Sequence, residues 1–396
     1  MFNQLKPMPA DPILGLLSQF REDPRPLKVD LGVGVYKDPQ GNTPILACVK
    51  TAERLRTETE TTKVYIGPSG SAKFNQLICR LAFGAEHPVM AQDRVRAVST
   101  PGGTGSLKVA ADFIKRCNPN ATVWVSNPTW ANHISLFQGA GLQVKNYPYY
   151  DNVNNQLKFD DMLAALQQLG ADDVVLLHAC CHNPTGQDLT EAQWDQVVAV
   201  ATERGFTPLI DMAYQGFGDG LERDAYGVRK MAQAVDAMLL CASCSKNFGL
   251  YRERIGACGV IAKNSQKAEI ALSVMLHVIR ANYSMPPAHG AALVETILDS
   301  AELTAQWLEE LAVMRNRING NRALLVDKIK AAGVTRDFGF IARQKGMFSF
   351  LGITPEQVAR LQQEYGVYMV SSSRISVAGI TEENVDYLAK AIAAVL

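Results

Sequence analysis

The sequence predicts an α/β protein, with a large domain in which helices flank a mainly parallel mixed sheet, and a smaller α+β domain. The chain has 396 residues, more than one hydrophobic core usually holds. From about residue 95, short apolar segments alternate with helical segments, which is typical of a parallel sheet. After about residue 335, short strands and helices mix without that alternation, which indicates the second domain.

The amino-terminal residues do not follow this alternation. Residues 1–40 are irregular and rich in proline, with a short apolar helix expected over residues 11–17. Residues 29–36 alternate like a strand, and their glycines indicate backbone that lies close to another group. A polar helix is expected over residues 46–60, followed by a loop at residues 65–70. An arm of this kind often wraps a partner subunit.

The core strands are expected where segments are apolar nearly throughout, as they are in sheets covered on both faces. The expected strands are residues 96–100, 123–126, 174–178, 207–211, 239–242 and 257–261, and the helices between them include residues 106–116, 191–204 and 227–237. One or two long amphipathic helices over residues 302–332 lead away from the sheet. Strands at 347–350 and 374–377 then mix with helices at 355–365 and 382–396. We therefore expect an arm with part of the small domain (1–43), a large domain (44–311) and a small domain (312–396).

The composition excludes several classes of protein. Lys+Arg and Asp+Glu both number 39, so the net charge is zero; this argues against nucleic acid or an anionic membrane as a partner. No apolar run approaches the ~20 residues of a membrane helix, and the amino terminus lacks a signal pattern. The eight cysteines are scattered, which favours a reducing cytoplasm over a disulfide framework.

The segment around Lys246 is the first candidate site. This lysine follows an apolar strand, and the carboxyl ends of strands are where open α/β sheets build their sites. Ser243 and Ser245 precede it, and Gly249 lets the chain turn away. A buried lysine can lose its proton and become a nucleophile toward carbonyl groups. Most lysines are exposed, so a surface lysine in a loop stays open as the alternative.

A glycine-rich turn at residues 100–106 (TPGGTGS) joins a strand to an amphipathic helix. Glycines at a helix amino terminus leave backbone N–H groups free for a phosphate, whose charge the helix dipole favours. The turn is not a nucleotide-binding P-loop, because it lacks the GK[ST] ending. It is not a dinucleotide fingerprint either, because Lys108 replaces the last glycine. A tight turn without a ligand is the alternative.

Other candidate ligands also follow strands. Asp211 ends an apolar strand and would face the crevice, or else cap a helix; Tyr214 lies three residues on. Asn183 is projected by an Asn-Pro-Thr-Gly turn. The two histidines and two cysteines at residues 178–182 do not match zinc spacing, so we expect no metal. Trp130 follows another strand and either packs in the core or stacks on a flat ring.

Two arginines are candidate anchors for anions. Arg280 and Arg374 each carry a guanidinium group, which suits a carboxylate bidentately. The alternative for each is a surface arginine. An imine-forming lysine, a phosphate-binding turn, an aspartate beside a ring nitrogen and a stacking aromatic together describe a pyridoxal-phosphate site.

These motifs, in this order, resemble those of the fold type I, class I aminotransferases along nearly the whole chain. The resemblance is closest to the bacterial aspartate and aromatic aminotransferases. The segments that carry it are DPILGL (11–16), TPGGTG (100–105), CCHNPTG (180–186), AYQGF (213–217), SKNFGLY (245–251) and RANYS (280–284).

The resemblance implies a role for each candidate residue. Lys246 would hold pyridoxal 5'-phosphate as a Schiff base and later move the proton between the substrate Cα and the cofactor. Asp211 would keep the ring nitrogen protonated, with His133 behind it. The other implied cofactor contacts are Gly103, Thr104, Trp130, Asn183, Tyr214, Ser243, Arg254 and, from the partner subunit, Tyr65. Arg374 would clamp the substrate α-carboxylate beside Gly34, Trp130 and Asn183, and the partner's Arg280 would meet a side-chain carboxylate.

The expected reaction is transfer of the amino group from L-aspartate to 2-oxoglutarate by ping-pong kinetics, in a cytoplasmic homodimer with some aromatic activity. Val35, Lys37, Thr43 and Thr104 resemble the aspartate enzymes, whereas Val64 and Met285 replace asparagines. The alternatives are aromatic amino acids as main donors, a β-lyase or decarboxylase on the same fold, and a regulator without catalysis. Both arginines argue against a lyase or decarboxylase. The intact Lys246 and the lack of a DNA-binding segment argue against a regulator.

Overall fold

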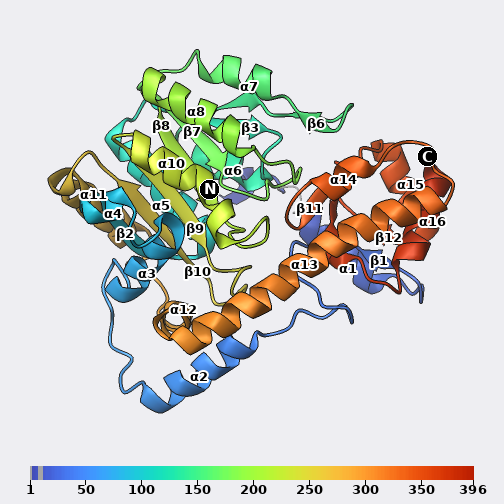
Figure 1. The fold of residues 1–396 in the computed structure, drawn as a ribbon, viewed down its shortest axis with the longest axis horizontal. Helices are drawn as coiled ribbons and strands as arrows, with labels where there is room; N and C mark the ends of the chain where they lie inside the picture. The colour runs from blue at the N-terminus through green and yellow to red at the C-terminus, as the bar shows by residue number, and fades with distance from the viewer. Residues whose placement is uncertain (1, 8–11) are drawn as a thin grey trace.

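The fold is that of a computed structural model, which describes residues 2–7 and 12–396 (Figure 1). The first α-helix, α1, spans Pro12–Glu22, and residue 11, where this helix was expected to begin, lies outside the described residues. Among the helices of the described ranges, none is long and apolar enough to cross a membrane.

A seven-stranded sheet forms the centre of the large domain, in the order β2-β10-β9-β8-β7-β3-β4. β10 runs in the direction opposite to the other six strands of this sheet, so the predicted mixed, mainly parallel sheet is confirmed. The strands are β2 (Val95–Pro101), β3 (Thr122–Asn127), β4 (Gln143–Pro148), β7 (Asp173–His178), β8 (Thr207–Met212), β9 (Met238–Ser243) and β10 (Ile255–Ile261). The sequence pattern missed β4, because it is an edge strand in which exposed polar residues interrupt the apolar ones.

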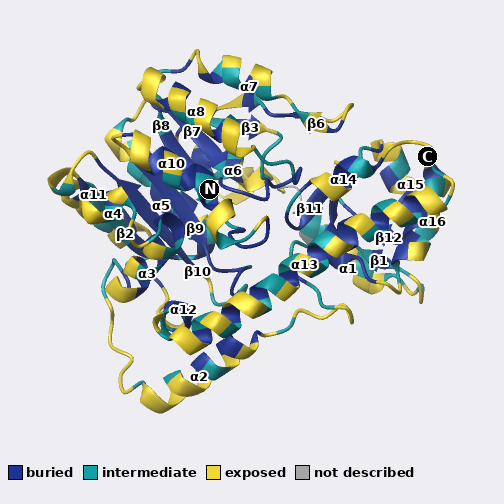
Figure 2. Cartoon of the chain, in the orientation of Figure 1, coloured by how far each residue is buried: buried dark blue, intermediate teal, exposed yellow. Residues whose placement is uncertain are grey.

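Helices cover both faces of this sheet. Apolar side chains of α5 (Gly102–Cys117), α6 (Ala131–Gly139) and α11 (Ser265–Asn282) pack on one face. Side chains of α3 (Ala72–Phe83), α7 (Phe159–Leu166), α8 (Glu191–Arg204) and α10 (Tyr226–Ala234) pack on the other. The central strands β9 and β10 are therefore buried along their whole length (Figure 2). The short elements of this domain are α4 (Pro88–Ala91), β5 (Tyr150–Asp151), β6 (Gln156–Leu157) and α9 (Leu221–Asp224).

One long helix, α13 (Ala301–Ala331), runs from the large domain into the small domain (Figure 1). Its first half packs against α2 (Ala47–Thr59) and α12 (His289–Asp299), and its second half against α14 (Gly339–Arg343) and α16 (Val385–Val395). The small domain also contains α15 (Pro355–Tyr365) and two strand pairs: β11 (Phe348–Phe350) with β13 (Arg374–Ser376), and β1 (Val29–Asp30) with β12 (Val367–Tyr368). The boundary at residues 311/312 falls inside α13, and the division into 1–43, 44–311 and 312–396 stays a proposal.

The strand expected over residues 29–36 is wrong beyond Asp30. Leu31 still donates its N–H to the carbonyl of Tyr368, but the chain then leaves the sheet. Its next contacts are with other groups: the Gly34 backbone lies against Phe348, and the Tyr36 N–H donates to the hydroxyl of Tyr251 at 2.8 Å. The alternating pattern therefore reflects packing between the domains and not strand pairing.

A buried arginine on α13 holds the small domain together. Arg322 donates to four backbone carbonyls, those of Ile341, Lys345, Gly346 and Phe348, at 2.6–3.0 Å. We expect Arg322→Met to lower the free energy of unfolding by about 3–5 kcal/mol, because it leaves these buried acceptors without a donor. Arg360→Met, at an exposed position of α15, should cost no more than ~1 kcal/mol. Urea unfolding of both variants checks this, and equal losses would contradict it.

Candidate active site

The candidate site is a pocket of about 270 Å³ at the carboxyl ends of the central strands, between the two domains. Most of the predicted site residues line it together. They are Gly34, Gly103, Thr104, Trp130, Asn183, Asp211, Tyr214, Ser243, Lys246, Arg254 and Arg374. The pocket is lined as well by residues that we did not single out, among them Ile13 and Phe348. His133, Tyr65 and Arg280 do not line the pocket of their own chain.

One end of the pocket is built to hold an anion. The amino terminus of α5 points its free N–H groups and positive dipole end there. A side chain at Gly102 would clash with the guanidinium group of Arg254, and a Cβ on Gly103 would lie 3.0 Å from Cβ of Ser243. Arg254 and Ser243 therefore lie directly against the glycine turn. Hydroxyl, guanidinium and backbone N–H groups converge on a space suited to a phosphate.

Lys246 is held by a tight turn after the buried strand β9. The N–H of Gly249 donates to the Lys246 carbonyl at 3.0 Å, and Gly249 has φ +64°, which glycine adopts without strain. The Lys246 ammonium lies 4.7 Å from the centre of the Tyr214 ring. Burial lowers the pKa of Lys246 to about 8, as does the nearby Arg254, although Asp211 opposes the shift. A lysine with this pKa has a neutral fraction that can act as nucleophile and base.

Asp211 lies at the carboxyl end of β8 and accepts a hydrogen bond from Nε2 of His133 at 3.0 Å. Burial raises the pKa of Asp211, but the hydrogen bond from His133 outweighs it, with a smaller contribution from the nearby Lys246, and leaves the pKa below the ordinary value. The carboxylate therefore stays ionised inside the pocket. Such a group stabilises a cation opposite it.

A directed chain of hydrogen bonds lies behind Asp211. The backbone N–H of Asn183 can only donate a hydrogen bond, and it donates to Nδ1 of His178 at 3.4 Å. Burial lowers the pKa of His178 to about 3, so its single proton is on Nε2, which lies 3.3 Å from the Thr129 hydroxyl. That hydroxyl is then free to donate to Nδ1 of His133 at 2.8 Å. His133 Nε2–H is left pointing at Asp211, which fixes the direction of the last bond.

Sequence reasoning missed the contributions of His178 and Thr129 to this chain. The position of His178 could have been predicted from how the strands align: His178 ends β7 directly opposite Asp211 on β8. Two polar residues that end neighbouring parallel strands must lie side by side. Thr129 gives no such signal, because its contact spans β7 and α6.

The small domain closes the pocket with Arg374. Its Nη2 donates to the Gly32 carbonyl at 2.7 Å, and its guanidinium lies 4.4 Å from the centre of the Phe348 ring. The Nε of Arg374 and Oδ1 of Asn183 are both buried without a partner among the described residues. A Cβ on Gly34 would lie 2.5 Å from the Phe348 ring, so Gly34 must lack a side chain. Two unpaired polar atoms in one pocket indicate a polar ligand.

Two predicted site residues lie on the outside of the chain. Tyr65 is 86% exposed in a segment without regular structure. Arg280, near the end of α11, is exposed and hydrogen-bonds the hydroxyl of Ser284. Neither residue is brought to the pocket by its own chain.

Comparisons with known proteins identify the family of this chain. Residues 26–392 match the family model described as aminotransferase class I and II. The chain is 50% identical to aspartate aminotransferase of Escherichia coli (strain K12) over 396 residues, all of both chains. It is also 50% identical to the aromatic-amino-acid aminotransferase of Pseudomonas aeruginosa over 394 residues, 100% of this chain and 98% of the relative.

A similar solved structure is the aromatic-amino-acid aminotransferase from Burkholderia pseudomallei covalently bound to pyridoxal phosphate. The TM-score is 0.98 at 47% identity, covering 100% of this chain and 99% of that one. Cytoplasmic aspartate aminotransferase from Saccharomyces cerevisiae gives a TM-score of 0.96 at 37% identity, with 100% and 98% covered. This chain belongs to the class I and II aminotransferases.

Proposed function

We propose that this protein is a pyridoxal-phosphate-dependent aminotransferase that moves the amino group of L-aspartate to 2-oxoglutarate and also accepts aromatic amino acids. The observation that carries this proposal is the pairing, in one pocket, of Lys246, whose pKa is lowered, with Arg374, a buried arginine with an unpaired Nε. The first can attack and deprotonate, and the second can bind the carboxylate that every amino acid carries.

The residues of the pocket fit pyridoxal phosphate. The glycine turn, Ser243 and Arg254 would hold the phosphate, and Asp211 would face the ring nitrogen. The unpaired Oδ1 of Asn183 offers an acceptor to the ring hydroxyl. Tyr214, Thr104 and Trp130 would complete the surroundings of the ring and phosphate. When bound, this cofactor supplies an electron sink for the substrate.

Each step of the chemistry then has a residue in this chain. Lys246 would hold the cofactor covalently until the substrate amine displaces it. The freed Nζ, whose neutral fraction is larger because burial lowers its pKa, would take the proton from the substrate Cα and return it. Arg374 would orient the substrate by its α-carboxylate, supported by the Phe348 ring. Asp211, kept ionised and aimed by His133, would hold a proton at the ring nitrogen.

The proposal includes a homodimer in which the partner's arm completes the site. Support comes from the exposed side chains of Val64, 74%, and Tyr65, 86%, in a segment that does not fold onto its own chain; exposed apolar residues of this kind often mark an interface. Tyr65 would reach the phosphate end of the neighbouring pocket, and Arg280 its substrate end. A cytoplasmic location is supported by eight free thiols.

A test of the activity is to add L-aspartate to the purified enzyme and follow the absorption spectrum of the cofactor. Conversion to the pyridoxamine form with release of oxaloacetate is the expected result. Pyruvate with ammonia, or alanine with CO₂, would replace the proposal by a lyase or a decarboxylase. Values of kcat/KM for aspartate, tyrosine and phenylalanine decide between the main proposal and the alternative of aromatic amino acids as main donors, which Val64 and Met285 favour.

We expect Arg280→Gln to reduce kcat/KM for aspartate by at least about thirtyfold, because loss of one partner of a desolvated ion pair costs ~2–5 kcal/mol. The loss for phenylalanine, which has no side-chain carboxylate, should stay below about tenfold. The control is Arg116→Gln on the exposed end of α5, which should change neither value. Equal losses for the two substrates would overturn the assigned role of Arg280.

We expect Thr129→Val to lower kcat for aspartate about tenfold. Valine keeps the shape of threonine but leaves ring nitrogens of His133 and His178 unpaired, which costs ~1–3 kcal/mol, and Asp211 loses its fixed donor. Thr129→Ser keeps the hydroxyl and should retain the kcat of the wild type. Steady-state kinetics of both variants check this. If the valine and serine variants had the same kcat, the hydrogen-bond chain would have no role in turnover.

A further inference from the structure

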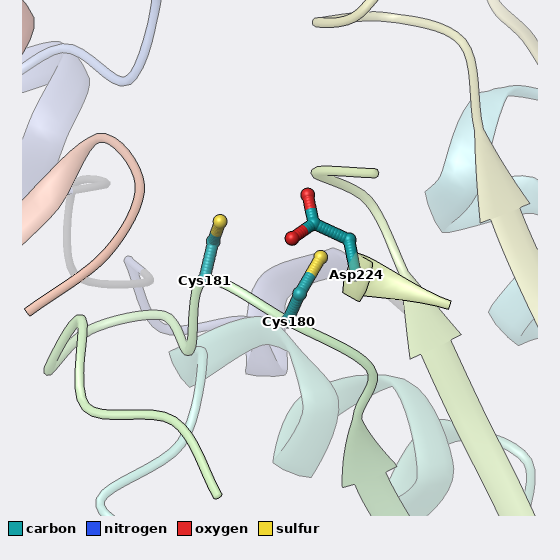
Figure 3. A group of neighbouring side chains, drawn as sticks. All are labelled: Cys180, Cys181 and Asp224. Carbon is teal, nitrogen blue, oxygen red and sulfur yellow. The ribbon is translucent and has the colours of Figure 1, made fainter. Parts of the chain in front are cut away.

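A pair of adjacent thiols lies beside the active site and has no role in the proposed mechanism. Cys180 and Cys181 follow β7, and their Sγ atoms and a carboxylate oxygen of Asp224 all lie within 4.8 Å of one another (Figure 3). In an extended chain, neighbouring side chains point to opposite sides. Cys181 instead has φ +52°, a conformation uncommon outside glycine. Both thiols consequently lie on the side of Asp224, with their Sγ atoms within 4.8 Å of each other.

The cluster is not suited to a metal cation. The Asp224 carboxylate already accepts backbone N–H groups from Gly216, Gly218 and Asp219 at 2.7–3.0 Å. A hydrogen bond to Cys181 and burial raise the pKa of Cys180 well above its usual range, and burial raises that of Cys181 to about 12. Both thiols are therefore protonated at neutral pH. A metal ion would have to remove two protons at these pKa values.

A neutral reagent that condenses with two thiols meets no such barrier. We propose that Cys180 and Cys181 form a chelating site for small trivalent arsenicals. In the reaction, an arsenic(III) oxide R–As=O forms two As–S bonds while its As=O bond breaks, and the oxygen leaves with both thiol protons as one water molecule. No atom changes its oxidation state, and no net charge is buried. A single thiol cannot form such a chelate.

One of the two thiols faces the active-site pocket, and the other does not. Cys180 is one of the residues that line the pocket, whereas Cys181 is covered by the small domain. A side chain on Gly346 would clash with Cβ of Cys181, and the neighbouring Lys345 N–H donates to the Gly186 carbonyl at 2.7 Å. Arsenic on both sulfur atoms needs room beside Cys181, where the Gly346 backbone packs directly against this residue. The adduct and the contact between Cys181 and Gly346 therefore exclude each other.

Capture also affects the active site, because the loop at Gly346 is joined to β11 and through it to Arg374 on β13. An adduct that holds this loop away from Cys181 displaces the carboxylate-binding arginine from the pocket. This effect on turnover rests on the proposed function, whereas the capture itself rests on the position of the thiols alone. Mass spectrometry separates the two, because it detects the adduct without an assay of turnover.

The test treats the purified holoenzyme with phenylarsine oxide and measures the mass of the intact chain. We expect one phenylarsenic group per chain, removed by a dithiol such as 2,3-dimercaptopropanol but not by 2-mercaptoethanol. After labelling, the protein is denatured and alkylated: Cys180 and Cys181 should be protected, and the other six of the eight cysteines modified. No adduct, or protection of a different pair, would overturn the proposal without any variant being needed.

Two serine variants give a matched comparison. Cys181→Ser should lose the adduct. Cys241→Ser should keep it, although Cys241 and Cys258 also face each other across β9 and β10. That second pair is fully buried and does not line the active-site pocket. An adduct that persists in Cys181→Ser, or disappears in Cys241→Ser, would place the capture at the wrong pair and contradict the proposal.

The covering role of Gly346 has its own variant. Gly346→Ala should be labelled about five- to thirtyfold faster than the wild type, because the clash and the positive φ of +76° disfavour the covered state by ~1–2 kcal/mol. Gly320→Ala on α13 is the control, since a Cβ there meets nothing within 4 Å; its labelling rate should match that of the wild type. Equal rates for Gly346→Ala and the wild type would show that this loop does not cover the thiols.

Discussion

Lys246→Ala is expected to reduce kcat for transamination between L-aspartate and 2-oxoglutarate by at least about 10⁴-fold, the upper range for loss of a positioned general base. This variant loses two functions at once, because the amine that would hold the cofactor is also the group that would move the Cα proton. No other lysine lines the pocket in the part of the chain that the structure describes. The measurement is release of oxaloacetate in steady state, with protein saturated with pyridoxal phosphate.

The matched control for this variant is Lys230→Ala, which removes an exposed lysine from α10 and should leave kcat unchanged. The absorption spectrum supplies a second readout: wild-type protein should show a covalently held cofactor that borohydride fixes to the chain, and Lys246→Ala should not. Full turnover in Lys246→Ala would remove the basis of the whole proposal. A loss of turnover with the cofactor still fixed to the chain would move the covalent link to another residue.

The large-domain half of the site could be predicted from the sequence because of how a parallel sheet is built. Trp130, Asn183, Asp211 and Lys246 each follow an apolar segment that reads as a strand, and the carboxyl ends of such strands meet at one edge. The chemistry of these side chains then points to pyridoxal phosphate as the ligand. The confirmed family, aminotransferase class I and II, agrees with that ligand. The strands themselves were visible because both faces are buried, as β9 and β10 show.

The small-domain half depends on contacts between residues that are far apart in the chain. Arg374 bonds the carbonyl of Gly32, 342 residues away, and no local pattern links the two. The ring of Phe348 supports Arg374 and leaves room only for a glycine at position 34, yet in the sequence Phe348 is an ordinary strand residue. Tyr65 and Arg280 illustrate a further limit, since their proposed positions require a second copy of the chain.

We expect Asp211→Asn to lower kcat for aspartate by about 10²–10³-fold, the cost of removing one preorganised electrostatic partner from a buried site. Asparagine keeps the size of the side chain and can still accept the hydrogen bond from His133. It carries no charge, so it cannot stabilise a proton on the ring nitrogen, and the electron sink becomes weaker. The structure gives the reason for the charge: the pKa of Asp211 lies below its ordinary value in spite of burial, chiefly because of His133.

The control for the charge is Asp236→Asn, at an exposed position before β9, which should not change kcat.

A double variant tests whether Thr129 acts on turnover through the hydrogen-bond chain. Thr129→Val should lower kcat less than Asp211→Asn does. Adding Thr129→Val to Asp211→Asn should lower kcat little further, because both substitutions act through the side chain at position 211 and such effects are not additive. If the two losses instead multiplied, Thr129 would act on turnover by a route other than His133 and Asp211.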